Sequence, residues 1–194
     1  MLTLLTAVIA AAKIMGVSTE DIRAAIMGFK GIRHRLEFVA EVDGVHFIDD
    51  SKGTNVDATL KAVESMKRET ILLLGGKNKG YDYKKLFMAL HNSKVVHVVL
   101  YGENRYELLK NAREQGYSKV SLCDGFDFAV RIAAMKAERG QTVLLSPASA
   151  SFDEFASYEE RGDKFVDIVE FLASKNTQRE EAILNVATRE EEVE

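Results

Sequence analysis

Residues 49–55 form the densest group of potentially reactive side chains in this chain. They read Asp-Asp-Ser-Lys-Gly-Thr-Asn and follow the apolar run at 45–48. Two carboxylates, an ammonium, hydroxyls and an amide at the start of a predicted helix can hold an anion through backbone N–H groups and the helix dipole. A capped helix with solvated charges is the alternative, and composition alone leaves both interpretations open.

Two further polar segments follow apolar runs. Residues 75–80, Gly-Gly-Lys-Asn-Lys-Gly, combine glycines that permit close backbone approach with lysines that can meet a carboxylate or phosphate. The alternative is a glycine turn with exposed lysines. Residues 146–153 contain three serines and Pro147, the one proline of the chain. Because the Gly-x-Ser-x-Gly pattern is missing, we predict a capping loop that hydrogen-bonds a ligand, without a serine nucleophile.

Other kinds of site are excluded by what the sequence lacks. Neither the Walker A pattern nor Gly-x-Gly-x-x-Gly occurs, and the four histidines show no metal-ligand spacing. The single Cys123 rules out an internal disulfide and a multi-cysteine zinc site, and we expect it to be a small buried side chain. We therefore predict no metal site, and we interpret residues 101–104 as a structural turn.

The elements that position these segments alternate between strand-like and helix-like patterns. The strand-like runs are 70–74, 95–100, 119–122 and 142–145, and the helix-like stretches are 83–91, 103–115, 126–139 and 159–173. A period of two over 36–42 leads through the hairpin turn at Asp43-Gly44 into 45–48. Short strands that are apolar on both faces and alternate with helices predict an α/β fold. Its sheet should be doubly wound, mainly parallel and Rossmann-like, with an N-terminal hairpin and ligands beyond the carboxyl ends of the strands.

The chain should divide into three parts. Residues 1–30 read as two helices; the first has little polar face, and Ser18 is the N-cap of the second. Such an apolar helix requires a partner, so we expect an exposed apolar face in this part, as in a piece of a larger domain. Residues 31–174 should form the main domain, and the charged tail 175–194 should form a short surface helix or stay mobile.

Composition limits the surroundings in which the protein works. A net charge of −4 and a pI near 5.7 argue against a mainly electrostatic nucleic-acid binder. Lys13 interrupts the apolar start well short of the ~20 residues that a membrane span needs. The lone cysteine suits a reducing compartment, and we expect a cytoplasmic protein that binds neither nucleic acid nor membrane.

Five segments occur in an order that points to a known family. They are residues 31–37, 48–55, 74–79, 145–155 and 158–165. Together they resemble the C-terminal part of the D-glutamate-adding ligases of the Mur ligase family, from the N-terminus to about residue 173. Any one segment would be weak evidence, whereas five in register are strong. Relatives that add other amino acids, or glutamate to folate, carry different residues at 50–55.

The resemblance implies an ATP-dependent ligase of peptidoglycan synthesis. ATP phosphorylates the alanyl carboxylate of UDP-N-acetylmuramoyl-L-alanine, and the amine of D-glutamate attacks the acyl phosphate; Mg²⁺ accompanies ATP in the complete enzyme. Lys52 is implied as the catalytic cation at the reacting centre. Arg35 and Asp50 are implied to approach the ATP. The implied D-glutamate-binding residues are Thr54, Lys79, Ser151, Phe152 and Tyr158.

The chain also departs from the family pattern. Complete enzymes are more than twice as long, and the phosphate-binding loop and the UDP-binding domain are missing. Residues 1–30 would then be a helical remnant of the central ATP-binding domain, and we expect the chain alone to be catalytically incompetent. Gly53 stands where alanine is frequent, and Ser149 where cysteine often occurs. The alternative is a stand-alone, non-catalytic α/β ligand-binding module; a nucleotide-dependent oxidoreductase is disfavoured by the missing glycine fingerprint.

Overall fold

The computed structural model describes the backbone of residues 2–29 and 31–191, and the side chains of residues 5–29 and 31–178. The chain divides into two compact units, residues 1–32 and residues 33–194. None of the helices in the described part of the chain combines the length and the apolarity that a membrane span requires.

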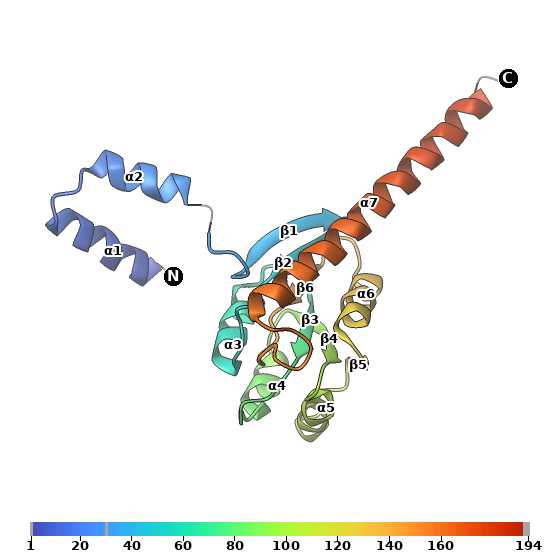
Figure 1. Ribbon diagram of the computed structural model, residues 1–194, viewed down its shortest axis with the longest axis horizontal. Coiled ribbons are helices and arrows are strands. Elements are labelled where there is room, and N and C mark those ends of the chain that lie inside the picture. The colour runs from blue at the N-terminus through green and yellow to red at the C-terminus, as the bar shows by residue number, and fades with distance from the viewer. Residues whose placement is uncertain (1, 30, 192–194) are drawn as a thin grey trace. The chain divides into compact units, whose positions relative to one another are not determined.

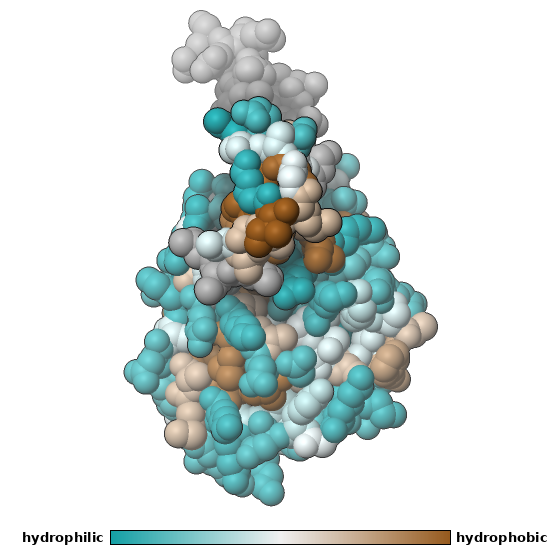
Figure 2. All heavy atoms as spheres, turned by 90° about the vertical axis from the view of Figure 1, so that its left-hand side faces the viewer, coloured by the Kyte–Doolittle hydropathy of each residue, from teal (hydrophilic) through white to brown (hydrophobic). Residues whose placement is uncertain are grey.

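The first unit is a pair of helices, α1 (Leu2–Ile14) and α2 (Thr19–Gly28). The Ser18 hydroxyl accepts a hydrogen bond from the Asp21 backbone N–H at 3.0 Å, which confirms the predicted N-cap. Large apolar side chains are open to solvent, and Ile14 is 87% exposed. Figure 2 shows hydrophobic side chains on this pair among hydrophilic ones. The exposed apolar face expected for this part of the chain is therefore present.

The second unit contains a six-stranded sheet in the order β1-β2-β6-β3-β4-β5 (Figure 1). The strands are β1 (Glu37–Val42), β2 (Val45–Asp49), β3 (Thr70–Gly75), β4 (Val95–Tyr101), β5 (Val120–Leu122) and β6 (Thr142–Leu145). β1 pairs antiparallel with β2, and all other pairs are parallel. The predicted mainly parallel sheet with an N-terminal hairpin is confirmed.

The hairpin turn follows from two residues that tolerate left-handed backbone. Asp43 has φ 53° and Gly44 has φ 77°, and Val42 pairs directly with Val45. Positive φ at both central residues is the geometry of a type I′ turn, whose twist matches that of the two strands. The Asp-Gly pair thus sets the register of β1 against β2.

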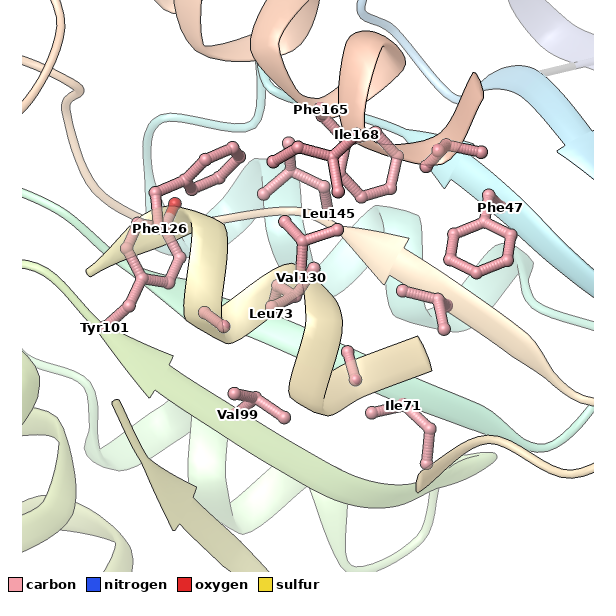
Figure 3. Packing of buried hydrophobic residues seen from close by; sticks show 14 of the residues in the cluster. Phe47, Ile71, Leu73, Val99, Tyr101, Phe126, Val130, Leu145, Phe165 and Ile168 are labelled. Carbon is pink, nitrogen blue, oxygen red and sulfur yellow. The ribbon is translucent and has the colours of Figure 1, made fainter. Parts of the chain in front are cut away.

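Both faces of the sheet are covered by helices. The helices are α3 (Val56–Ser65), α4 (Lys84–Leu90), α5 (Arg105–Glu114), α6 (Phe126–Lys136) and α7 (Tyr158–Glu191). Alternate side chains of β3 point to opposite faces: Ile71 and Leu73 pack with α6 and α7, and Leu72 and Leu74 with α3, α4 and α5. Figure 3 shows the first of these cores, with Phe126 and Val130 of α6 and Phe165 and Ile168 of α7 against the sheet.

α7 is longer than the sequence pattern predicted. A helix end near residue 173 was expected, but the helix continues to Glu191. Residues 174–191 contain neither glycine nor proline and are rich in Glu, Arg and Ala, so the chain holds no local signal that ends a helix. The apolar pattern ends near residue 173 because the described side chains that follow it no longer pack against the core. The backbone conformation does not change there and stays helical.

Candidate functional site

Three polar loops meet at the carboxyl ends of β2, β6 and β3, which are neighbours in the sheet. The loop after β3 pairs with the loop after β6 through a bridge between Lys77 and Ala150, with N···O distances of 2.8 and 3.0 Å. The loop after β2 joins the loop after β6 through the Ala148 N–H, which donates to the Gly53 carbonyl at 2.9 Å. Residues far apart in the sequence therefore form one continuous polar edge, where open parallel sheets bind ligands.

Gly75 and Gly76 allow the loop after β3 to pack closely against the neighbouring backbone. Gly75 has φ 145° and Gly76 has φ 132°, both in the region that favours glycine. A Cβ on Gly75 would collide with the Tyr101 carbonyl, and one on Gly76 with the Ala150 carbonyl. The close backbone approach predicted for this segment is real, and it brings the loop against its neighbours.

Arg161, on the first turn of α7, connects two of these loops through hydrogen bonds of its side chain. Its guanidinium is fully buried and donates from Nε to the Ser51 hydroxyl at 3.0 Å and from Nη2 to the Ser51 carbonyl at 3.0 Å. Nη2 also donates to the Ser149 carbonyl at 3.2 Å. Among the described residues, Nη1 has no hydrogen-bond partner. One cation thus ties the loop after β2 to the loop after β6 and to α7.

Asp49, at the end of β2, and His34 form a buried pair close to these loops. His34 Nδ1 lies 2.7 Å from Asp49 Oδ2, and the Ser51 N–H donates to Asp49 Oδ1 at 2.7 Å. Burial raises the pKa of Asp49, and the hydrogen bond from His34 opposes that rise. His34 was one of four histidines predicted to have no metal-ligand role.

His34 and Asp49 belong to a group of side chains whose chemistry can be compared with what Mg²⁺ requires. In the described part of the chain, the His34, Glu37 and Asp49 ligand atoms form one group within 4.8 Å of one another. The group contains an imidazole, and both Asp49 oxygens are already engaged. Mg²⁺ requires near-octahedral oxygen ligation and keeps several waters, so these three residues do not fit it.

Asp50 lines a small cavity of about 230 Å³, together with Arg35 and Lys52. Burial raises the pKa of Asp50 to about 6, while the hydrogen bond that the Ser146 hydroxyl donates at 2.7 Å opposes the rise. Lys61 also lines the cavity, so its lining contains three cations and one carboxyl group. Such a cavity can accept an anion, because opposite charges attract strongly where water is partly excluded.

Gly53 matters for the shape of this cavity. A Cβ at this position would lie 2.5 Å from Asp50 Oδ2 and 2.6 Å from the Ser146 hydroxyl oxygen. An alanine here requires these side chains to shift.

Lys52 and Tyr158 are in direct contact. Lys52 Nζ donates to the Tyr158 hydroxyl at 2.8 Å and lies 4.6 Å from the centroid of its ring. The Ser51 hydroxyl donates to the Tyr158 carbonyl at 2.8 Å. The start of α7 therefore positions the ammonium group of the loop after β2.

Lys79, on the loop after β3, and Phe152, on the loop after β6, form a second pair of a lysine and an aromatic ring. Lys79 Nζ lies 5.3 Å from the centroid of the Phe152 ring, and that ring is 58% exposed. Ser151, next to it, is 2% exposed. Thr54 is half-buried on the loop after β2. The predicted site residues thus fall into an Arg35–Asp50–Lys52 group, the contact of Lys52 with Tyr158, and the Lys79–Phe152 pair.

Two of the three serines after β6 are used within the protein. Ser146 donates to Asp50, and the Ser149 hydroxyl lies 2.9 Å from the Tyr83 hydroxyl and accepts from Asn104 Nδ2 at 2.9 Å. Burial raises the pKa of Tyr83. The loop therefore does much of its hydrogen bonding to the protein rather than to a ligand.

The sequence reasoning gave Arg161 no role, although a signal existed. Arg161, Phe165 and Ile168 share one helical face by their spacing of four and three, and Phe165 and Ile168 are core residues. A charged residue on the buried face of a helix requires partners within the protein. The partners lie 110 and 12 residues away, so the sequence could point to the need but not to Ser51 and Ser149.

Comparison with known proteins settles the family. The model of the Mur ligase glutamate ligase domain matches residues 34–149, the region that contains β1 to β6, the loops after β2 and β3, and the start of the loop after β6. The chain belongs to the Mur ligase family. It is 48% identical over 163 residues to the UDP-N-acetylmuramoylalanine–D-glutamate ligase of Pelotomaculum thermopropionicum, and 43% identical over 159 residues to that of Alkaliphilus metalliredigens.

These relatives are much longer than this chain. The match covers 84% of this chain and 36% of the Pelotomaculum ligase, and 82% and 35% in the Alkaliphilus comparison. The chain therefore spans about a third of the length of the curated relatives it matches and is homologous to their C-terminal portion.

Solved structures of Mur ligases share the fold. The UDP-N-acetylmuramate–alanine ligase of Thermotoga maritima matches with a TM-score of 0.62 at 16% identity, over 86% of this chain and 36% of that one. A Mycobacterium tuberculosis folylpolyglutamate synthase complexed with ADP matches with a TM-score of 0.58 at 12% identity, over 81% and 37%. At such identities the likeness concerns the fold alone.

Proposed function

We propose that this chain carries the D-glutamate-binding side, and part of the ATP-facing side, of a ligase that adds D-glutamate to UDP-N-acetylmuramoyl-L-alanine. The observation that carries the proposal is the joining, at one sheet edge, of two loops that carry lysines with a third loop that carries serines. Lys52 and Lys79 are on two of these loops, and Arg35 lies beside the cavity next to them. A dianionic amino acid requires such cations together with oriented donors.

Each residue of the proposed D-glutamate pocket has a physical reason for its role. The Lys79 ammonium pairs with a carboxylate of D-glutamate, and its contact with the Phe152 ring limits the positions it can take. Among the described residues, the hydroxyls of Thr54 and Ser151 have no protein hydrogen-bond partner, so they remain available to the ligand. Tyr158 borders the pocket and orients Lys52.

In the proposed reaction, the alanyl carboxylate attacks the γ-phosphate of ATP, releases ADP and becomes an acyl phosphate. The D-glutamate amine then attacks the acyl carbon, and the tetrahedral intermediate collapses to the amide and inorganic phosphate. Lys52 stabilises the negative charge that develops on the intermediate, because its ammonium is held in place before the reaction. Arg35 and Asp50 face the ATP from this side.

We propose that the chain does not complete this reaction by itself. Its sequence contains no Walker A pattern, and the group of His34, Glu37 and Asp49 does not fit Mg²⁺. Phosphate and metal binding would then fall to residues outside this chain. ATP hydrolysis or amide formation by the purified chain would contradict this part of the proposal.

Calorimetry tests the pocket directly. D-Glutamate titrated into the full chain should bind, L-glutamate should bind more weakly, and Lys79→Ala should weaken D-glutamate binding about tenfold, as loss of a charge-assisted hydrogen bond predicts. Lys110→Ala is the matched control, since Lys110 is an exposed lysine on α5 with one long ion pair to Glu114. Equal heats from the native chain and Lys79→Ala would disprove the pocket.

The second candidate is a non-catalytic α/β binding module that uses the same sheet edge. The cavity lined by Arg35, Asp50 and Lys52 favours it, because an anion can bind there without a reaction. Adding the remaining two thirds of a relative's ligase as a separate polypeptide distinguishes the two functions. Amide formation that depends on Lys52 supports the ligase, and binding without restored turnover supports the module.

A further inference from the structure

A second cavity lies at the opposite end of β2 from the candidate site. It has a volume of about 520 Å³ and is bordered by the β1–β2 hairpin, α6 and α7. Val42, Val45 and Phe47 from the hairpin form its buried floor and are at most 8% exposed. Met135 of α6, which is 81% exposed, and the half-buried Leu172 of α7 form its accessible apolar wall. Cavities of roughly 300–1,000 Å³ with mostly apolar walls are typical of small-molecule sites.

The rim of this cavity is positively charged, although the protein as a whole carries a net charge of −4. Arg131, Arg139 and Lys175 line it, and Asp43 is the one carboxylate that lines it. None of the three cations makes an ion pair with a carboxylate of the described residues. Among the side chains that the structure describes, the lining of the cavity thus has three positive charges against the one negative charge of Asp43.

Two of these cations are held close to the same aromatic ring. The Arg131 guanidinium lies 5.5 Å from the centroid of the Phe171 ring, and Lys175 Nζ lies 5.7 Å from it. Like charges brought together on one ring repel each other, and a bound anion would offset this repulsion. Arg139 approaches from the other side, where its side chain lies 3.4 Å from the position of a Cβ on Gly44.

We propose that this cavity binds an organic anion with an apolar body. Its carboxylate or phosphate would meet Arg131, Arg139 and Lys175, and its body would cover the wall formed by Met135 and Leu172. A cationic ligand would face three like charges. An inorganic anion would leave the apolar wall open to water, so both the head and the body contribute to recognition.

Calorimetry of the full chain with three probes tests whether both the anionic head and the apolar body of the ligand are recognised. Decanoate combines the anionic head with an apolar body, acetate has the head alone, and decyltrimethylammonium has a similar body with a positive head. Decanoate should bind at least tenfold more tightly than either of the others. Equal binding of the cationic probe would overturn the proposal, because general apolar adhesion would then explain the heat.

Variants locate the site. Arg131→Glu combined with Arg139→Glu should weaken decanoate binding at least tenfold, whereas Lys136→Glu, on the same helix but away from the cavity, should change it less than twofold. Ala134→Phe, which fills the apolar part without a charge change, should also weaken it. Unchanged binding in the double variant would overturn the proposal, since decanoate would then bind elsewhere, such as on the exposed apolar residues of α1.

Vesicles distinguish a free anion from a lipid surface. The chain should not sediment with phosphatidylglycerol vesicles, because the site is a hollow whose floor of Val42, Val45 and Phe47 is at most 8% exposed, and a flat surface cannot enter it. Sedimentation that the double charge reversal abolishes and that decanoate does not displace would overturn the proposal in favour of a membrane-binding surface.

Discussion

All six residues of β3 are buried, whereas α2 contains no buried residue. Both units contain many apolar side chains, yet only the α/β unit surrounds them with helices on two sides of a sheet. A pair of helices of 13 and 10 residues has too little surface to bury its own apolar side chains. The α/β unit is therefore stabilised from within, whereas the helical pair leaves large apolar side chains exposed to solvent.

The two units also differ in how they treat charge. The α/β unit buries Arg161, Asp49 and Asp50 beneath its polar edge, and each has partners there. The charged groups of α1 and α2 are exposed on the surface. Burying charge costs free energy, and the core of the α/β unit is large enough to offset that cost where a site is built.

Replacing one phenylalanine by alanine in each unit should give the largest difference in stability between the two units. Phe165→Ala should lower the free energy of unfolding of the α/β unit by about 3–5 kcal/mol, because it leaves a cavity in a fully buried core. Phe29→Ala, at a position that is 68% exposed, should change it by less than about 0.5 kcal/mol. Urea unfolding followed by circular dichroism measures both; similar losses would contradict the contrast in burial.

Removing the buried cation should have the next largest effect. Arg161→Ala should destabilise the α/β unit by about 3 kcal/mol, because two carbonyls and a hydroxyl lose a charged donor in a buried place. D-Glutamate binding should weaken as well, since the loops after β2 and β6 lose their common anchor. Arg33→Ala is the control: its ion pair with Asp163 is exposed, and the expected loss is below about 1 kcal/mol.

The buried carboxyl of Asp50 should make stability depend on pH. Burial raises its pKa from 3.8 to about 6, so the folded state holds the proton more tightly than the unfolded state. The stabilisation is complete below the unfolded pKa and is lost as pH rises through about 6. Relative to Asp50→Asn, the native chain should lose on the order of 2 kcal/mol between pH 4 and pH 7.5.

The comparison with Asp50→Asn removes the parallel contribution of Asp49, whose pKa burial also raises. Urea unfolding of both proteins at several pH values gives the difference. A difference that does not change with pH would show that Asp50 is ionised equally easily in the folded and unfolded states.

Deleting residues 1–32 should have the smallest effect on stability. The melting temperature of the α/β unit should shift by no more than about 2 °C, because the two cores contain no residue of the helical pair. Self-association should decrease, since the exposed Ile14 and Met15 are removed. Scanning calorimetry and light scattering measure these effects; association that persists after the deletion would locate the sticky surface on the α/β unit.

Much of the fold was predictable because its signals are local. Asp43-Gly44 predicted the hairpin turn, Ser18 predicted the start of α2, and Cys123 is buried as expected. The predicted end of α7 near residue 173 was wrong, because an apolar pattern indicates burial and the helix continues to Glu191 through a segment without glycine or proline. The roles proposed for Lys52 and Lys79 in ligand binding stay predictions.

The sequence by itself determined the strands, the helices and the polar segments after β2, β3 and β6, because these depend on side-chain periodicity and turn residues. Only the tertiary structure decided which polar groups meet. Arg161 reaches Ser51 across 110 positions, Asp49 pairs with His34, and Ser146 and Ser149 are engaged within the protein. The physical reason is that a buried polar group must find a partner, and the sheet order decides which partner lies within reach.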